Sequence, residues 1–493
     1  MAEYTIPQDA IRAYETISAK AEKYRDLWAY YDGEQKIKYS TERLRKVFQD
    51  INARFSENWC AVVIDSALDR INLKSFDVAK NPRATEQLNE LWQKYDLGLE
   101  AVEIHRAAQV CGEGYAIAWK DDEGETEAYC NDARQVHVFY DEDNPRKPSF
   151  AAKLWVDKDG FARLTLYYPD RLEYYISTKK AKELSKIEGD TTQSMAAKMF
   201  KPAQTPQAPN PFGKIPVFHF RLERRRIKSA LTNVIEPQDA VNKLLSDMMV
   251  AAEYGAFKQR AVISQMEIKK GTLKNAPNEI WLLPAADGEG QDTSVHEFSP
   301  NELANYFNAI DKLVYAIGTI SRTPKHYFMQ QGGDPSGEAL IAMEAPLNKK
   351  CQQYIDNFTP TWRSLAAFLL ELEGVSGIEA KDIKPIFDKP ETVQPRTQAE
   401  IHQLDANAGV PIVTQLRREG WSDKEIEDMQ QDKENASGPP TSNPVGGGQS
   451  PPDALAQKRQ QISELRLQAR QQMAGAVTGN GNGGGQNGGI QNT

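Results

Sequence analysis

The sequence predicts an α+β fold that is mainly helical, with long helices and a small β component. Two observations predict it. Apolar residues recur at three- and four-residue intervals over long stretches, which is typical of amphipathic helices. Between these stretches, short apolar runs flank turns that contain Asp and Gly, which is typical of β-hairpins. The chain has 493 residues, and at about 150 residues per domain this suggests about three domains.

The composition predicts a soluble protein with a substantial core. Hydrophobic residues make up 40% of the chain and charged residues 26%, which excludes wholesale disorder. The four cysteines are scattered without a CxxC pair, as expected for structural thiols in a reducing compartment. The first residues contain no apolar signal-peptide core, and no apolar run approaches the roughly 18 residues of a membrane span. We therefore expect a soluble protein made inside the cell, with no membrane partner.

The N-terminal half predicts helices followed by hairpins. Apolar spacing predicts helices over residues 11–31, 59–71 and 88–95, the first ended by Gly33 and the last by Gly98. Two hairpins are predicted, one pairing 115–119 with 126–129 and one pairing 154–156 with 162–168. A polar stretch with prolines at 202, 206, 209 and 211 is expected to break the chain before an apolar run at 215–220.

Three long helical segments follow in the second half. The first covers about 227–254, and the second opens with a capping box at 299–302 and continues through Ile317. The third begins near Asp334-Pro335, with Glu338 in its first turn, and its apolar stripe runs to Leu372. Pro346 and Pro360 lie inside it, so a kink or a division into segments is expected. A Lys-rich, strand-like module from 260–263 to 280–283 separates the first two helices, and a polar loop with a Gly-Gly pair separates the last two.

The C-terminal part predicts one more strand, further helices and a flexible tail. The strand is expected at 383–387, and a second capping box at 422–425 begins a helix. From residue 436 the chain is rich in Gly and Pro, which indicates a flexible tail, with a possible helix at 453–474.

The sequence motifs give no support to an enzyme, and we expect no catalytic residue, metal or cofactor. P-loop, dinucleotide-binding and zinc-protease motifs are absent from the sequence, and the six histidines are dispersed, so we expect them to be structural or surface residues. The run Asp141-Glu142-Asp143 offers one alternative, a metal-dependent nuclease, but the following Asn-Pro favours a solvated turn. Asp157-Lys-Asp-Gly160 is interpreted as a hairpin turn, because Phe161 and Tyr168 stand where a calcium loop needs oxygen ligands.

Charge is the remaining signal. The chain has 60 Lys and Arg against 69 Asp and Glu, a net charge of −9, whereas proteins that hold nucleic acid over a broad surface are usually basic. Any contact with nucleic acid is therefore local or weak. The local basic clusters are Arg224-Arg225-Arg226-Lys228, which is interpreted as a solvated helix start, then Lys258, Arg260, Lys269, Lys270 and Lys274, and finally Arg322, Lys325 and His326.

Five sequence pieces, in their order and spacing, resemble a known family over about residues 5–435. The pieces are Gly112-Glu-Gly-Tyr-Ala116, Gly213-Lys-Ile-Pro-Val-Phe-His-Phe220, Glu236-Pro-Gln-Asp-Ala-Val-Asn242, Ser321-Arg-Thr-Pro-Lys-His-Tyr327 and Ser336-Gly-Glu-Ala-Leu340. The chain resembles the portal, or head-to-tail connector, proteins of tailed double-stranded-DNA bacteriophages, of the siphophage type.

The resemblance implies a portal fold with wing, stem, clip and crown regions. It implies a ring of twelve copies at one capsid vertex, with double-stranded DNA passing through it without sequence specificity. The implied regions are a wing at 1–228, stem helices at 229–255 and 301–320, a clip at 256–300, a tunnel loop at 321–335, a long wing helix and closing strand at 336–390, and a helical crown at 391–435, followed by the flexible tail at 436–493.

The resemblance also implies roles for residues and for partners. It places Arg322, Lys325, His326, Gln330 and Gln331 in the tunnel loop facing DNA, and Arg260, Lys269, Lys270 and Lys274 in the clip facing the motor or adaptor, with Leu244, Leu245, Ile310 and Leu313 packing subunits in the stem. The implied partners are the terminase large subunit, a head-tail adaptor, and the major capsid and scaffolding proteins. The implied location is the portal vertex of the virion, after synthesis in the host cytoplasm.

The charge pattern is compatible with this function. Duplex DNA carries one charge per about 1.7 Å, so a conduit must avoid a broad basic surface that would hold its cargo. The missing P-loop fits a protein that leaves ATP hydrolysis to a separate motor. The alternative in the same setting is another oligomeric phage head-tail adaptor or scaffold protein without a DNA channel.

Overall fold

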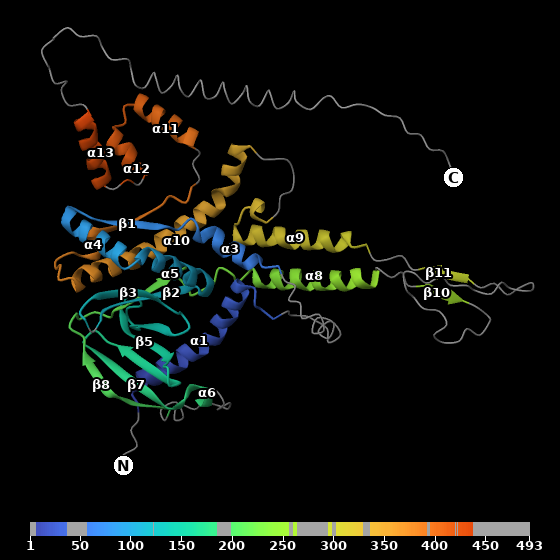
Figure 1. Cartoon of the computed structure of the whole chain (residues 1–493), viewed down its shortest axis with the longest axis horizontal. Helices are drawn as coiled ribbons and strands as arrows, with labels where there is room; N and C mark the ends of the chain where they lie inside the picture. Colours follow the sequence, from blue (N-terminus) through green and yellow to red (C-terminus); the bar gives the residue numbers. More distant parts are fainter. Residues whose placement is uncertain are drawn as a thin grey trace, which may run out of the picture. The chain divides into compact units, whose positions relative to one another are not determined.

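The computed structural model of the chain describes residues 6–36, 57–121, 123–184, 199–255, 260–263, 294–297, 302–328, 336–391, 395–419, 421 and 423–436. Two compact units divide the chain at residue 429, and nearly all described residues belong to the first. In the described part of the chain, helices carry most of the regular structure and the strands form four small sheets, so the predicted class, α+β and mainly helical, is confirmed (Figure 1).

The N-terminal part contains the three predicted helices and two elements that were not predicted. The predicted helices are α1 (Gln8–Asp32), α3 (Trp59–Leu68) and α4 (Pro82–Lys94), and Gly33 ends α1 in the left-handed conformation, with φ at 73°. The added elements are β1 (Leu73–Val78) and α5 (Leu97–Cys111). Gly98 therefore does not end a helix, since α4 stops before Tyr95 and Gly98 lies in the first turn of α5. Helix α5 is buried on most sides, so it has no one-sided apolar stripe for periodicity to detect.

A three-stranded antiparallel sheet has the order β3-β2-β9. Strand β2 (Glu113–Lys120) pairs with β3 (Thr126–Asn131), which confirms the first predicted hairpin, and its other edge pairs with β9 (Val217–Arg221). Tyr115 in the middle strand is paired on both sides, with Asn131 of β3 and with His219 of β9. Helix α5 packs against this sheet, and α10 reaches β9.

A five-stranded antiparallel sheet follows the chain order β4-β5-β6-β7-β8. Its strands are β4 (Val136–Tyr140), β5 (Pro148–Val156), β6 (Phe161–Tyr167), β7 (Arg171–Lys180) and β8 (Phe200–Pro209), with the short helix α6 (Ala181–Leu184) after β7. The pairing of β5 with β6 confirms the second predicted hairpin. The proline-rich stretch does not break the chain as expected, because it forms β8 at the edge of the sheet, where a residue without an N–H costs no ladder hydrogen bond.

Helix α10 (Gly337–Leu372) is continuous through Pro346 and Pro360. Of the two expected outcomes, a kink or a division into segments, the division does not occur, and Figure 1 shows the helix bending along its course. Its N-cap is Ser336, whose side chain accepts the N–H of Ala339, two residues after the predicted start at Asp334. Glu338 lies in the first turn, as predicted. The predicted strand β12 (Ile383–Phe387) is confirmed and pairs antiparallel with β1.

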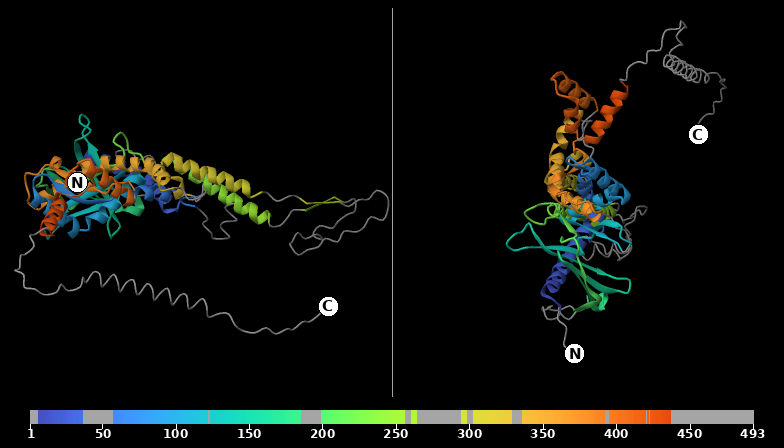
Figure 2. Two further views of the ribbon diagram at one scale, coloured as in Figure 1. Left: turned by 90° about the horizontal axis from the view of Figure 1, so that it is seen from above. Right: turned by 90° about the vertical axis from the view of Figure 1, so that its left-hand side faces the viewer.

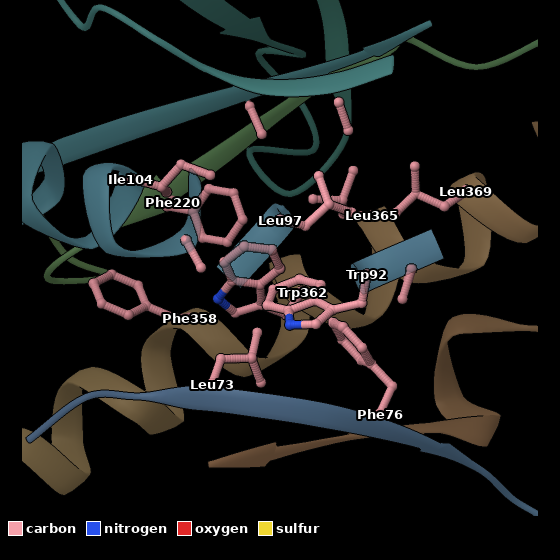
Figure 3. Close-up of a cluster of buried hydrophobic side chains, with 14 of the residues drawn as sticks. Leu73, Phe76, Trp92, Leu97, Ile104, Phe220, Phe358, Trp362, Leu365 and Leu369 are labelled. Carbon is pink, nitrogen blue, oxygen red and sulfur yellow. The ribbon is translucent and has the colours of Figure 1, made fainter. Parts of the chain in front are cut away.

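The largest core cluster lies where α10 crosses α4, α5 and the β1-β12 pair (Figure 3). Trp362 is 1% exposed and packs edge-on against Trp92, with ring centroids 5.7 Å apart. Its indole N–H donates to Nε2 of His105 at 3.0 Å, and His105 stacks on Phe358. His105 is thus a structural residue, and burial lowers its pKa to about 3.

Helices α8 (Ile235–Gly255) and α9 (Ala304–Ser321) lie side by side, as both Figures 1 and 2 show. Helix α8 starts eight residues later than the apolar pattern suggested, because residues 230–234 form turns. Helix α9 starts at Ala304 without a side-chain cap, so Glu302 does not lie in its first turn; residues 299–301 fall outside the described part. Between the two helices, β10 (Arg260–Ile263) pairs with β11 (Ser294–Glu297); the predicted second strand at 280–283 lies outside the described residues.

Three further helices follow β12: α11 (Pro395–Asn407), α12 (Ile412–Glu419) and α13 (Asp423–Ala436). They agree with the predicted helical character of 391–435. The predicted cap at Ser422 and everything after residue 436, including the possible helix at 453–474, lie outside the described residues.

A buried ionic network joins α1 to both of the larger sheets. The carboxylate of Glu113, which is fully buried, accepts from Lys20 Nζ and from the Tyr24 hydroxyl, each at 2.7 Å, and lies 3.0 Å from His219 Nε2. Lys20 also donates to the carbonyl oxygen of Val136 at 2.5 Å. Burial alone would raise the pKa of Glu113, but the hydrogen bond from His219 and the charge of Lys20 outweigh it and hold the pKa below its usual range.

The tautomer of His219 follows from its neighbours. Its Nε2 faces the Glu113 carboxylate and its Nδ1 lies 3.1 Å from the Tyr140 hydroxyl, so Nε2 carries the proton and Nδ1 accepts. Burial lowers the pKa of His219, which keeps the ring neutral. The site therefore holds one positive and one negative charge in direct contact, so the Glu113 carboxylate is buried with its counter-ion.

The acidic run at 141–143 forms the predicted exposed turn. Asp141 Oδ1 accepts the backbone N–H groups of Asp143 and Asn144. Within the described residues, no three His, Cys, Asp or Glu side chains gather in a way that could hold a metal ion.

Candidate functional site

The candidate site is the end of α9 and the first part of the loop that leads to α10, residues 321–328. Helix α9 is fixed against α8 by an apolar seam, in which Val241 and Leu245 of α8 meet Ile310, Val314 and Ile317 of α9. These side chains repeat at three- and four-residue intervals on both helices, so one face of each is buried along the pair. This packing against α8 fixes the position of the C-terminal end of α9.

Helix α9 ends at a residue in the left-handed conformation. Arg322 has φ at 58°, which is costly for a residue with a side chain, and its N–H and that of Thr323 close the last turn on Thr319 and Gly318. This conformation turns the chain sharply, with Thr323 and Pro324 buried and the Arg322 side chain exposed.

The loop is then pinned by one aromatic side chain. Phe328 is 9% exposed, and its ring lies 5.4 Å from that of Trp59. Gly318 of α9 makes room for it, since a Cβ at this position would lie 3.1 Å from Phe328 Cε2 and 3.2 Å from the carbonyl oxygen of Thr323. A side chain at position 318 would therefore displace the loop.

Two cations from other elements, Lys350 and Arg70, also hold the loop. The buried Lys350 of α10 donates to the carbonyl oxygen of Ser321 at 2.9 Å. Arg70, which follows α3, donates to the hydroxyl of Tyr327 at 2.8 Å. Burial, with a smaller contribution from the nearby charge of Arg322, lowers the pKa of Lys350 to about 8.

Arg70 connects the loop to two other parts of the chain. Its guanidinium lies 3.2 Å from the carboxylate of Glu344 in α10, and it donates to Oδ1 of Asn348 and to the carbonyl oxygen of Pro390, each at 2.8 Å. Pro390 lies in the connection between β12 and α11. Movement of the loop, of α10 or of the Pro390 carbonyl therefore disturbs the contacts of the same guanidinium.

The structure describes three of the five residues predicted for the tunnel loop. Arg322 and Lys325 are exposed, and Lys325 begins the short 3₁₀ turn η1 (Lys325–Tyr327). His326 is half-buried, with its Nε2 3.6 Å from a carboxylate oxygen of Glu344, so it faces the body more than the other two residues do. Gln330 and Gln331 lie outside the described residues.

Of the other predicted site residues, the structure describes some and others lie outside the described part. Arg260 is in β10, opposite Glu297, and Lys269, Lys270 and Lys274 lie outside the described residues. Leu245 and Ile310 are 4% and 6% exposed in the seam of a single chain, so they are not surfaces that only a neighbouring subunit would cover. Leu244 and Leu313 are half-buried beside the same seam.

Sequence reasoning missed Arg70 and Lys350. Lys350 carries a signal, because it lies three residues after Leu347 and four before Tyr354, on the apolar stripe of α10. A charged residue on such an apolar stripe is either buried with a polar partner or reaches beyond the apolar surface to water. Arg70 carries no such signal, since its partners lie more than 250 residues away in the sequence.

A comparison with protein families decides the identity of the chain. A family model described as phage portal protein, SPP1 Gp6-like, matches residues 15–439. The chain belongs to this portal family. The match spans α1 to α13 except for the first residues of α1, so it includes the helix pair and the loop together.

Two mycobacteriophage proteins are similar over nearly the whole length. Both are named portal protein, one from Mycobacterium phage L5 at 24% identity and one from Mycobacterium phage D29 at 23%, each over 467 residues. Each alignment covers 88% of this chain and 90% of the relative. The resemblance inferred from the motifs is thereby confirmed at the level of the family. In the described residues, none of the helices is both long and apolar enough to span a membrane.

Proposed function

We propose that the chain is the repeating subunit of a ring at one vertex of the phage capsid, through which double-stranded DNA enters during packaging and leaves on ejection. The observation that supports it most is the α8-α9 pair ending in an anchored loop with exposed Arg322 and Lys325, within a portal-family chain. One such loop carries few charges, but a closed ring presents every copy to the DNA at once.

The regions follow from this role. Residues 229–255 and 301–320 form the stem, 256–300 the clip that faces the terminase large subunit and then the head-tail adaptor, and 321–335 the tunnel loop. Residues 1–228 and 336–390 form the wing, in contact with the major capsid and scaffolding proteins, and 391–435 the crown. The protein acts without catalysis or a cofactor, as part of the virion.

Phosphate contacts explain why few cations serve this role. Each phosphate that is neutralised releases counterions and adds to the affinity, so a broad basic surface would hold DNA in place. The chain has a net charge of −9, and its loop cations are local. Weak contacts, repeated around a ring, restrain DNA sideways and still release it along the axis.

The experiment is a mass measurement on the purified protein, with negative-stain imaging. Twelve copies of the 55.3 kDa chain have a mass of about 660 kDa. A ring with a central opening of duplex width supports the proposal. A small oligomer that binds only a pre-existing ring would instead indicate a head-tail adaptor or scaffold protein without a channel, and a monomer would contradict both.

A further inference from the structure

Two side-chain amides are buried on the first turns of α8, beside the apolar seam. Gln238 is 0% exposed and Asn242 3%, and because they are four residues apart they share one face of the helix. A buried amide costs free energy unless it is hydrogen-bonded, so two of them on one helix face indicate specific partners. Both belong to the piece at 236–242 by which the sequence resembles portal proteins.

The partners are backbone groups about 180 residues earlier in the chain, at 57–59. Asn242 Oδ1 accepts the N–H of Glu57 at 3.1 Å, and Gln238 Nε2 donates to the carbonyl oxygen of Glu57 at 2.7 Å. Gln238 Oε1 accepts the N–H of Trp59 at 2.8 Å. Three hydrogen bonds from α8 therefore fix the backbone where the chain enters α3.

The ring of Trp59 is oriented by the same segment. Its indole N–H donates to a carboxylate oxygen of Glu57 at 2.8 Å, so the residue whose backbone α8 holds also orients the ring. The ring lies against Phe328, with centroids 5.4 Å apart. Phe328 is the aromatic side chain that pins the loop, in the space that Gly318 leaves for it. A continuous set of contacts thus joins the start of α8 to the loop.

We propose that Gln238 and Asn242 are positioning residues for the loop at 321–328. They act through Trp59, whose ring supports Phe328. The inference rests on the proposed function, because it says how the start of the first stem helix sets the place of the loop cations. A displacement of the first turns of α8 moves the backbone of Trp59 and removes the surface against which Phe328 packs. The loop position then depends on α8 as well as on α9.

The test measures amide hydrogen exchange in peptides covering 318–328. Gln238→Met keeps an unbranched side chain of similar length but removes the hydrogen bonds to Glu57 and Trp59. Exchange in the loop should become faster by on the order of tenfold, while exchange in β5 and β6 stays unchanged. Exchange in the loop equal to that of the unaltered protein overturns the inference.

The matched control is Ser246→Ala. Ser246 is also buried on α8, and its hydroxyl donates to the carbonyl oxygen of Asn242 within the helix, not to the segment at 57–59. Its removal should leave exchange in the loop unchanged. Loop exchange that rises equally in Ser246→Ala and Gln238→Met would show a general effect of loosening α8 and would contradict a positioning role.

A pair of substitutions at Glu57 tests the same contacts without altering α8. Glu57→Gln keeps an acceptor for the indole N–H of Trp59, so exchange in the loop should stay slow, whereas Glu57→Leu removes the acceptor and should accelerate it. Both variants keep the backbone hydrogen bonds to Gln238 and Asn242. Equal loop exchange in the two variants would show that the orientation of the Trp59 ring does not matter, which overturns the inference even if Gln238→Met fails to fold.

A double-mutant cycle with Phe328→Leu shows whether the effect passes through this side chain. With Phe328→Leu present, Gln238→Met should have little further effect on exchange in the loop, because contacting residues in one path are not additive. Additive effects would overturn the path through Phe328.

The packaging assay separates this inference from the proposed function. Rings of Gln238→Met should keep their mass but package DNA less well, because the displaced loop carries Arg322 and Lys325 with it. Normal packaging by rings whose loop exchanges faster would overturn the link between α8 and DNA handling. Failure of the unaltered protein to form rings overturns the proposed function instead, and the exchange comparison needs neither a ring nor DNA.

Discussion

The ammonium of Lys20 in α1 lies 2.7 Å from the carboxylate of Glu113 in β2, and the Glu113 side chain is fully buried. The two residues are 93 positions apart, and the pair is completed by Tyr24 and His219. Glu113 stands between Gly112 and Gly114, in one of the motifs by which the sequence resembles portal proteins. The motif thus supplies the acceptor that ties α1 to the sheet.

Substituting Glu113→Gln should destabilise the fold strongly. The change leaves the Lys20 ammonium buried without its counter-ion, and breaking a buried pair in this way costs about 3–5 kcal/mol. Urea unfolding followed by circular dichroism measures the loss. In the double variant Lys20→Met with Glu113→Gln, part of the stability should return, because no charge remains buried.

The control for this prediction is Glu125→Gln. Glu125 pairs with Lys94 on the surface, where both side chains are more than half exposed, so its removal should leave the unfolding midpoint nearly unchanged. Equal effects of the two substitutions would show that the Glu113 network adds nothing beyond a surface pair.

Acidification should destabilise the protein before its carboxylates titrate. Burial lowers the pKa of His105 to about 3, and burial together with the charge of Lys20 lowers that of His137 to about 3. In the unfolded chain both have a pKa of about 6.5, so below pH 6.5 the unfolded state binds protons that the folded state does not. Stability therefore falls as the pH falls, by about 1.4 kcal/mol per pH unit for each histidine.

The free energy of unfolding should be measured between pH 7.5 and pH 5, above the range in which unfolded carboxyl groups take up protons. In this window His137→Gln should reduce the slope of the unfolding free energy against pH by the contribution of one histidine. The Gln side chain can accept from Lys20 but does not titrate. A slope of zero in the unaltered protein would contradict the lowered pKa of these two histidines in the folded state.

The sequence predicted the elements that carry periodic or turn signals. The helices around Ile11, Trp59 and Leu88, both hairpins and the strand at 383–387 all appear. Elements without such signals were missed: α5 is buried on most sides, and β8 contains prolines that an edge strand tolerates. The edge position is a property of the assembled sheet, so no local pattern of residues could reveal it.

The candidate site was predictable in position but not in its anchoring. The loop was located because helix signals surround it and because its residues match the portal motif at 321–327. Its contacts with Arg70 and Lys350 depend on tertiary structure, and the burial of Leu245 and Ile310 within one chain needed the seam of α8 and α9 to be seen. Spacing alone cannot tell an intrachain seam from an interface between subunits.

Arg70→Met should loosen the loop without dissolving the fold. The substitution keeps an unbranched side chain of similar length but removes every donor to Tyr327, Glu344 and Pro390. Amide hydrogen exchange should become faster in peptides covering 318–328 and the region around Pro390, while the exchange of β5 and β6 stays unchanged. Arg134→Met, which removes a local pair with Asp132, is the control and should leave the loop peptides unaffected. Protection of 318–328 equal to that of the unaltered protein would show that Phe328 and Lys350 hold the loop without Arg70.

Neutralising the loop should separate DNA handling from assembly. Arg322→Ala with Lys325→Ala removes two exposed cations per chain, and exposed charge pairs contribute only about 0–1 kcal/mol, so rings should retain their mass. The loss is repeated in every copy around the duplex, so DNA packaging or retention should fall in a packaging assay. Lys349→Ala is the matched control, because Lys349 is an exposed cation on α10 beyond the loop, and it should package normally. Normal packaging by the double variant would contradict a role of the loop in contacting DNA, and failure of its rings to form would show that the two side chains are needed for assembly instead.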